Sequence, residues 1–216
     1  VEPAEGFLLS STGAERPVIG DEVEINSSSN QSDTPTSNAT IEGLRFEGPD
    51  SGPALEVETG GSGETNNNLI FRDNEFVASD IGVDADNIKN STFTDNLFTV
   101  AQNKTAEELL SLGNRTNDDK NGSNVSVKNN DFQTPGNTEL ERSGQSANAI
   151  EFGPDSGEIK DNNFNVNTDE GVKVLIGQFN GSINGNGDLG DKKTSIDDEN
   201  TGVSNDEVEL SPLDSS

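Results

Sequence analysis

The residues of this sequence that could do chemistry are mostly carboxylates. Asp and Glu together number 41 among 216 residues, whereas Lys and Arg number 13, so the formal net charge is −28. Pairs such as Asp84/Asp86 and Asp118/Asp119 have the residue types that glycoside hydrolases use, but a chain this acidic produces such pairs by chance. The charge excludes a general nucleic-acid binder, because nothing offsets repulsion from phosphates. The absence of His and Cys removes the usual general base, thiolate zinc sites and disulfides.

One segment has the spacing of a calcium-binding loop. Asn117, Asp119 and Asn121 alternate with other residues and precede Gly122, which is how an EF-hand loop begins. The acidic residue expected at the twelfth position is missing, since Lys128 occupies it. Calcium binding and a plain polar turn both remain open here, and no other cofactor is expected.

Asparagine followed by x-Ser/Thr, the acceptor motif for N-glycans, is frequent in the chain. The nine matches are Asn26, Asn30, Asn38, Asn90, Asn103, Asn114, Asn121, Asn124 and Asn180. A chain rich in Asn, Ser and Thr generates some matches by chance, so we expect only a subset to carry covalent N-glycans. The start at Val1, without Met, favours a secreted chain trimmed of a signal peptide; a truncated chain is the alternative.

Internal repetition indicates which elements position these residues. The pattern apolar-x-x-Asn-x-Phe occurs four times, beginning at Phe71, Phe93, Val127 and Ile159. Degenerate copies begin at Ile41 and Ile183. Between the copies lie short segments of alternating apolar residues, typical of half-buried strands: Leu55/Val57, Ile81/Val83, Leu110/Leu112, Ile150/Phe152 and Val172/Val174.

The repeat has a physical reason. Apolar residues five positions apart cannot face one side of a straight strand, so a corner is expected between them. We expect the Asn at the fourth position to form that corner, because Asn tolerates left-handed backbone angles. Stacked coils would then align an asparagine ladder and a phenylalanine stack. The ladder comprises Asn74, Asn96, Asn130, Asn162 and Asn186, and the stack Phe46, Phe76, Phe98, Phe132 and Phe164.

These repeats resemble those of the right-handed parallel β-helix, or pectate-lyase-like, superfamily, and the acidic surface resembles that of secreted proteins from halophilic archaea. The resemblance implies an all-β solenoid of about six coils over residues 41–189. Residues 1–40 are expected to form an N-terminal cap, and residues 190–216 an acidic segment whose part 207–213 is a candidate terminal strand. A short helix capped by Thr105 and closed by Gly113 is the alternative to a strand at Leu110/Leu112.

Relatives with this fold include polysaccharide lyases, which use calcium-bound carboxylates with a Lys or Arg base, and glycoside hydrolases. Arg72, Lys128 and Lys160 share one repeat offset and should form an outward row, for which charge relief is the ordinary interpretation. No catalytic signature of the family matches, so no catalytic residue is assigned.

The function expected is that of an extracellular structural protein, a glycosylated subunit of a cell-surface filament or envelope assembly that self-associates head to tail. A carbohydrate-binding adhesin module, which would contact surface glycans, and a polysaccharide-degrading enzyme are the alternatives. No apolar run is long enough to cross a bilayer, and no nucleic-acid partner is expected.

Overall fold

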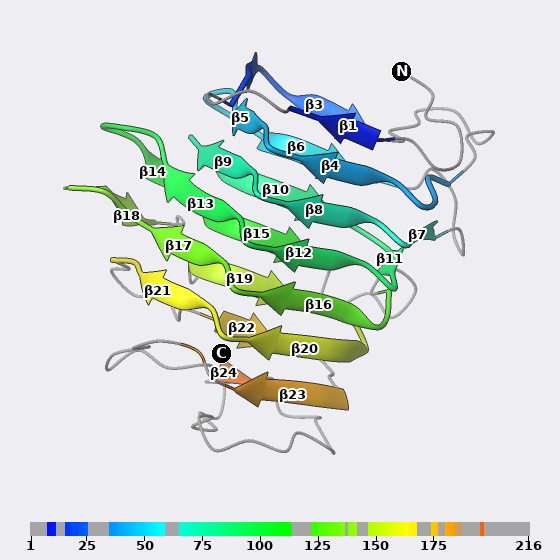
Figure 1. Ribbon diagram of the computed structural model, residues 1–216. Coiled ribbons are helices and arrows are strands. Elements are labelled where there is room, and N and C mark those ends of the chain that lie inside the picture. The colour runs from blue at the N-terminus through cyan, green and yellow to red at the C-terminus, as the bar shows by residue number, and fades with distance from the viewer. Residues whose placement is uncertain are drawn as a thin grey trace.

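The computed structural model describes residues 8–11, 16–25, 35–58, 65–113, 122–136, 138–141, 147–167, 174–176, 180–184, 186 and 195–196. In this part of the chain every regular element is a strand, and the strands form a parallel β-solenoid (Figure 1). The described residues include no helix with the length and apolar content to cross a membrane. The predicted all-β class is therefore confirmed.

Three parallel sheets form the faces of the solenoid. Face 1 contains β1 (Leu8–Ser10), β4 (Thr40–Glu42), β8 (Ile70–Arg72), β12 (Thr92–Thr94), β16 (Val125–Lys128), β20 (Ser156–Lys160) and β23 (Asn180–Asn184). Face 2 contains β2 (Val18–Gly20), β5 (Arg45–Glu47), β9 (Glu75–Ala78), β13 (Leu97–Val100), β17 (Asp131–Gln133) and β21 (Asn163–Asn165). Face 3 contains β3 (Val23–Ile25), β6 (Pro53–Val57), β10 (Ile81–Ala85), β15 (Glu108–Leu112), β19 (Asn148–Phe152), β22 (Val174–Ile176) and β24 (Ser195–Ile196).

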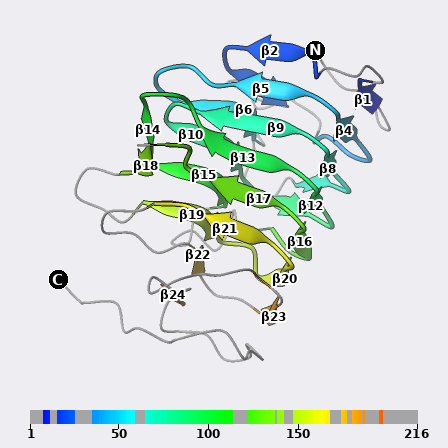
Figure 2. The same ribbon diagram turned by 60° about the vertical axis from the view of Figure 1, so that its left-hand side comes forward.

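Two smaller sheets lie at corners. One pairs β7 (Asn66–Asn67) with β11 (Ile88–Lys89), and the other pairs β14 (Thr105–Ala106) with β18 (Glu139–Leu140). In both ribbon views β14 and β18 lie at the left edge of the stack (Figures 1 and 2).

The chain winds in the right-handed sense (Figure 1), as parallel crossovers almost always do. The solenoid has about four full turns, and further strands stack on both ends, so that faces 1 and 3 each hold seven strands. The predicted count of about six coils differs slightly from this. At the spacing of neighbouring strands, seven strands span about 30 Å along the axis.

The core is a column of stacked rings. Phe46, Phe76, Phe98, Phe132 and Phe164 pair across face 2 in register. Successive ring centroids lie 5.2, 5.0, 4.8 and 4.9 Å apart with interplanar angles of 23° or less. All five rings are buried, so the predicted phenylalanine stack is confirmed. On face 1, Phe71 and Phe93 stack at 4.6 Å.

The asparagine ladder lies at the corner between faces 1 and 2. Asn130 shows the pattern: its Oδ1 accepts from the backbone N–H and the Nδ2 of Asn96, both at 3.0 Å. Its Nδ2 donates to the Phe93 carbonyl and to the Asn162 Oδ1, again at 3.0 Å. The predicted ladder of Asn74, Asn96, Asn130, Asn162 and Asn186 is thereby confirmed, with Asn186 accepting from Asn162.

The predicted backbone role of these asparagines is wrong. Four described residues with positive φ stand just before a ladder asparagine: Asp73, Asp95, Asn129 and Asp161, with φ between 52° and 56°. Gly43, with a φ of 70°, holds the same position in the degenerate copy that begins at Ile41. The preceding residue turns the chain, which leaves the ladder asparagine free to aim its amide inward and bond along the stack.

The alternative helix near residues 105–113 is also wrong. Thr105 begins β14, and Glu108 to Leu112 form β15, which pairs with β10 and β19 on either side. Leu110 aligns with Val83 and Ile150, as the strand interpretation predicted. Pairing on both edges stabilises a strand more than a single capping box stabilises a short helix.

The predicted N-terminal segment contributes a further turn. β1, β2 and β3 pair in parallel with β4, β5 and β6. At the other end β24 pairs with β22. The candidate strand at 207–213 lies outside the described residues.

Candidate functional site

Face 3 carries a row of carboxylates on its outer side. In the strand register Glu24 lies beside Glu56, Glu56 beside Asp84, Asp84 beside Ser111, and Ser111 beside Glu151. The strands of face 3 contain no Lys or Arg. One hydroxyl therefore interrupts four carboxylates at the spacing of neighbouring strands, and no cation on those strands neutralises them.

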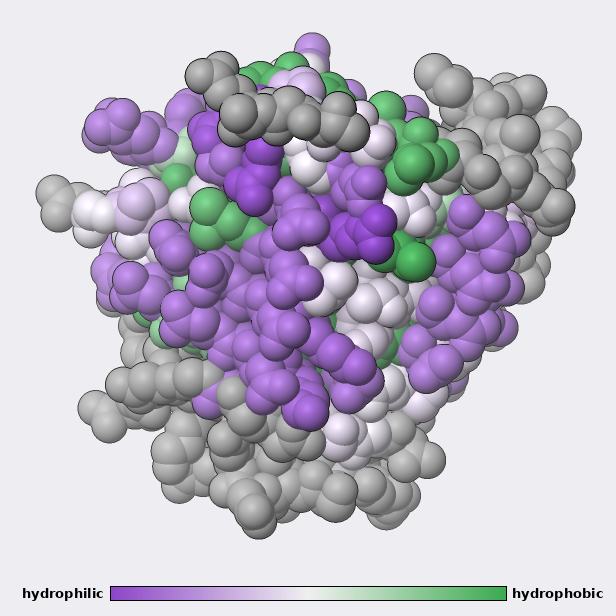
Figure 3. All heavy atoms as spheres, viewed as in Figure 1, coloured by the Kyte–Doolittle hydropathy of each residue, from purple (hydrophilic) through white to green (hydrophobic). Residues whose placement is uncertain are grey.

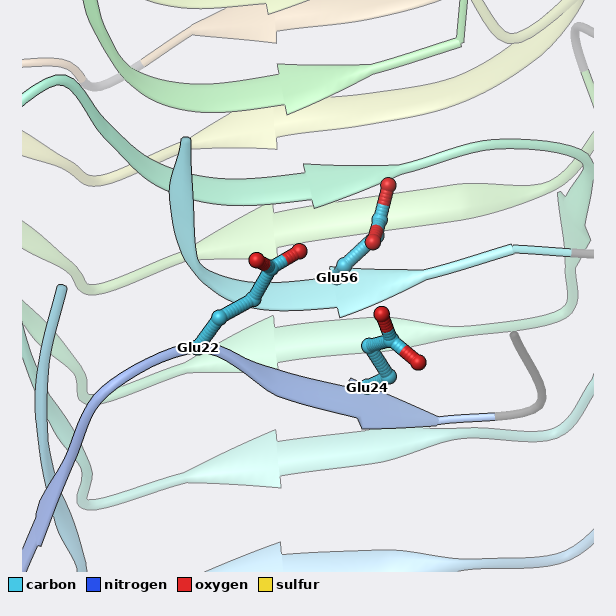
Figure 4. Close-up of side chains that lie close together, drawn as sticks. All are labelled: Glu22, Glu24 and Glu56. Atoms are coloured by element: carbon cyan, nitrogen blue, oxygen red, sulfur yellow. The ribbon is translucent and has the colours of Figure 1, made fainter. Parts of the chain in front are cut away.

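The row is densest at its N-terminal end. Glu22, Glu24 and Glu56 each offer a carboxylate oxygen, and these oxygens all lie within 4.8 Å of one another. Glu22 and Glu24 come from the first turn, just before and within β3, whereas Glu56 comes from β6 (Figure 4). The cluster thus joins the first turn to the second.

Burial and crowding raise the pKa of two carboxyls on this face, Glu56 and Asp84. Burial, a hydrogen bond with Glu22 and repulsion from Glu58, Glu22 and Asp84 raise the pKa of Glu56 to about 8. Burial and repulsion from Asp86 raise the pKa of Asp84 to about 6, although the Ser111 hydroxyl donates to it and acts in the opposite direction. Both groups therefore stay protonated to a higher pH than ordinary surface carboxyls do.

Such a cluster has the ligand type that a hard cation prefers. Calcium binds carboxylate oxygens at 2.3–2.6 Å, so two oxygens within 4.8 Å of each other are able to contact one ion. A proton shared between Glu22 and Glu56 satisfies the same arrangement. The sequence pattern did not reveal this cluster, because it depends on the register between β3 and β6.

Faces 1 and 2 differ, because their cations are paired. On face 1, Arg72 bonds to Glu42 and Lys128 to Glu158. On face 2, Arg45 bonds to Glu75 and, at 2.8 Å, to Glu47.

The predicted row of Arg72, Lys128 and Lys160 is present. Lys128 and Lys160 are register neighbours, and Thr94 separates Lys128 from Arg72. Arg72 and Lys128 form ion pairs with neighbouring carboxylates, which agrees with the interpretation that this row offsets the surrounding negative charge.

Three predicted sequons fall on the corner that precedes face 1. Asn38, Asn90 and Asn124, together with Asn68, have φ between 50° and 57°. We call these four residues the corner column. Their amides bond to each other: Asn68 Nδ2 donates to Asn38 Oδ1 at 2.9 Å, and Asn124 Nδ2 to Asn90 Oδ1 at 2.8 Å. Asn90 Nδ2 donates to Asn67 Oδ1 at 2.9 Å.

The other predicted site residues are placed as follows. Asn103 is exposed in the loop between β13 and β14. Asn180 begins β23. The remaining sequons, Asn26, Asn30, Asn114 and Asn121, and the calcium-loop candidates Asn117 and Asp119 lie outside the described residues.

The N-terminal end of the solenoid exposes apolar side chains. Leu8 is 61% exposed, Leu9 42% and Val18 57%, and these three account for most of the exposed large apolar residues in the described part of the chain. The space-filling view shows apolar residues at the surface over this end (Figure 3). β1, β2 and β3 are also the outermost described strands of their sheets, so this end presents both apolar atoms and strand edges.

Comparison of the chain with protein-family models, with curated proteins and with solved structures finds no match.

Proposed function

We propose that the chain is an extracellular structural protein, a glycosylated subunit of a cell-surface filament or envelope assembly that joins head to tail through the ends of its solenoid. The observation that carries this proposal is the exposure of Leu8, Leu9 and Val18 together on the first turn. Apolar side chains gathered on one end of a stackable unit favour burial against another protein surface.

Strand edges give the contact its direction. β1, β2 and β3 lie at one end of the three sheets, and β23 and β24 at the other end of faces 1 and 3. Open edges pair readily with further strands. A second copy placed in the same orientation would continue the parallel pairing, and such a heterologous contact repeats without closing.

Charge sets the conditions for assembly. Two copies that each carry a net charge of −28 repel each other in dilute salt. In about 1 M salt the Debye length falls to about 3 Å. This screens the repulsion between copies, so the short-range apolar contact at the ends of the solenoid decides whether they associate. The carboxylate row of face 3 would oppose lateral association in dilute salt, where charges are not screened. Saline surroundings and a halophilic archaeal source are part of this proposal, as is membership of the pectate-lyase-like group of β-helices.

The distribution of charged groups favours a structural role over polysaccharide cleavage. A lyase of the kind considered needs carboxylates and a basic side chain around one substrate. In the described residues Arg72 and Lys128 of face 1 are held in ion pairs with Glu42 and Glu158, and the strands of face 3, which carry the carboxylate row, contain no Lys or Arg.

Light scattering tests the proposal. In multimolar salt we expect the average mass to rise with protein concentration above the monomer value of 22.8 kDa. The double variant Leu8→Asp/Val18→Asp should stay monomeric. Ile70→Asp is the matched control, because Ile70 is 38% exposed on face 1 but lies within the stack rather than at its end. A wild-type chain that remains monomeric at every concentration and salt would contradict head-to-tail assembly.

A further inference from the structure

The described sequons differ in how their three residues are placed. In Asn38-Ala39-Thr40, Asn90-Ser91-Thr92 and Asn124-Val125-Ser126 the asparagine is exposed but the middle residue is buried. Ala39 is 2% exposed, and Ser91 and Val125 are fully buried. The third residue of each lies in a strand of face 1 that pairs on both edges.

These three matches follow from the architecture of the coil. The corner needs a residue that accepts a left-handed backbone, for which Asn is suited. The next residue must point into the core, and the one after it must point outward from face 1, where Thr and Ser suit a strand. A corner position, a core position and an outward strand position in succession therefore favour the sequence Asn-x-Ser/Thr, whether or not a glycan is attached.

Asn103-Lys104-Thr105 is placed differently. All three residues are exposed, and Asn103 has a φ of 61° in a turn closed by the Lys104 N–H donating to the Ala101 carbonyl at 3.1 Å. The loop leads to β14, at the left edge of the stack and outside the three faces (Figure 1). The Lys104 Nζ bonds to Asp50 Oδ1 at 2.7 Å, which holds the loop while leaving the Asn103 amide exposed.

A glycosyl transferase has to enclose the asparagine and the hydroxyl residue of a sequon in its own active site. At Asn103 a folded chain presents both residues at its surface, and Thr105 begins a strand that pairs with β18 alone in the described part of the chain. At the three corner sequons the middle residue would have to leave the core and the strand would have to separate from its neighbours. Such local opening has a free-energy cost that lowers the population able to react.

We propose that Asn103 is an N-glycan acceptor of the folded chain, and that Asn38, Asn90 and Asn124 are structural corner residues. The reaction forms a bond between Asn103 Nδ2 and the anomeric carbon of a sugar. It breaks the bond from that carbon to the phosphate of an activated glycosyl donor. The phosphate leaves with the bonding electrons, and the Nδ2 proton passes to a base of the transferase. This inference rests on the extracellular, glycosylated character proposed above.

The test uses folded chain produced without glycans, an oligosaccharyl transferase and its lipid-linked oligosaccharide donor. Short peptides that span the four sequons serve as unstructured references, with an enzyme that modifies all four. Glycopeptide mass spectrometry then gives the rate at each site. In the folded chain Asn103 should react about as fast as in its peptide, and Asn38, Asn90 and Asn124 at least about tenfold slower than in theirs.

Variants separate the sites. Asn103→Gln and Thr105→Ala should each abolish modification of the 103–105 sequon in the folded chain, Thr105→Ser should retain it, and Asn124→Gln should leave it unchanged. Modification of Asn90 or Asn124 in the folded chain at the peptide rate would overturn the inference, as would a folded chain unmodified at Asn103. Glycopeptide mapping and light scattering are independent measurements. If the chain is modified at Asn103 but stays monomeric, the proposed head-to-tail assembly is refuted and the proposed acceptor site stands.

Discussion

Two columns of asparagines run along the solenoid, and they differ in burial rather than in residue type. The ladder between faces 1 and 2 is buried, and each interior amide bonds to the asparagines above and below and to a backbone carbonyl. The corner column before face 1 is exposed, and its amides bond to one another and to the Asn67 side chain. Buried amides left without partners destabilise the fold strongly, whereas exposed amides exchange partners with water. The ladder should therefore hold the stack together, and the corner column should contribute its backbone angle.

The largest effect is expected in the middle of the buried ladder. Asn130→Ala removes four hydrogen bonds, two accepted by Oδ1 and two donated by Nδ2. Because their partners stay buried, we expect a loss of about 5 kcal/mol in the free energy of unfolding, measured by urea denaturation.

The exposed column supplies the matched control. Asn90→Gly keeps the left-handed backbone and removes amide bonds that are open to water, so the loss should be about 1 kcal/mol or less. Equal losses at Asn130 and Asn90 would contradict the distinction between the two columns.

The phenylalanine stack should be nearly as sensitive as the ladder. Phe98 is buried between Phe76 and Phe132, with ring centroids at 5.0 and 4.8 Å. Phe98→Ala leaves a cavity between two turns, and we expect a loss of about 4 kcal/mol. Thermal or urea unfolding measures it. Leu97→Ala, on the outer side of the same strand, should lose clearly less stability. Comparable losses in the two variants would mean that the ring stack contributes no more to stability than the outer side chains.

A half-buried glycine next to the corner column should tolerate substitution poorly. A Cβ at Gly157 would lie 1.8 Å from the carbonyl oxygen of Val125, the neighbour of Gly157 in the strand register. Gly157→Ala should force β16 and β20 apart and cost about 3 kcal/mol. At Gly20 a Cβ would meet nothing within 4 Å, so Gly20→Ala is the control, and similar unfolding midpoints for the two variants would refute the expected crowding.

The smallest effect concerns the acidic face. Because the pKa of Glu56 is raised to about 8 in the folded chain, folding takes up a proton between about pH 4.5 and 8, and stability should fall as the pH rises through that window. Glu56→Gln should reduce this fall and raise the melting temperature at pH 8. Melting curves at pH 5 and pH 8 measure both effects.

Glu141→Gln, at an exposed position, is the matched charge control. It changes the net charge by the same amount without touching the cluster. An identical pH dependence in Glu56→Gln and Glu141→Gln would mean that overall charge, and not the cluster, governs the response. Millimolar calcium should raise the melting temperature of the wild-type chain more than that of Glu56→Gln if the cluster binds the ion.

Sequence reasoning found what the repeat encodes. Asn and Phe recur at fixed offsets, so the ladder and the ring stack could be predicted from residues 71–164. The left-handed corner was assigned one residue too late, although Gly43, Asp73 and Asp95 each carry a residue type suited to that backbone. The alternative helix near Thr105 failed because local capping signals do not include the pairing of β15 with both neighbours.

The acidic cluster could not be predicted for a related reason. Residues 1–25 contain no copy of the repeat, so nothing in the sequence aligned Glu24 with Glu56. The three corner sequons misled the prediction in a different way. They match the acceptor motif for N-glycans, although the corner, core and strand positions of the coil already account for their residue types. Burial of Ala39, Ser91 and Val125, together with pairing of the following strand on both edges, separates them from Asn103.

Electron microscopy of the glycosylated chain in multimolar salt tests the central proposal most directly. We predict ordered filaments with an axial repeat near one solenoid length, about 30 Å, which disappear in Leu8→Asp/Val18→Asp and persist in Ile70→Asp. Dispersed single particles of the wild-type chain under the same conditions would contradict assembly through the ends of the solenoid.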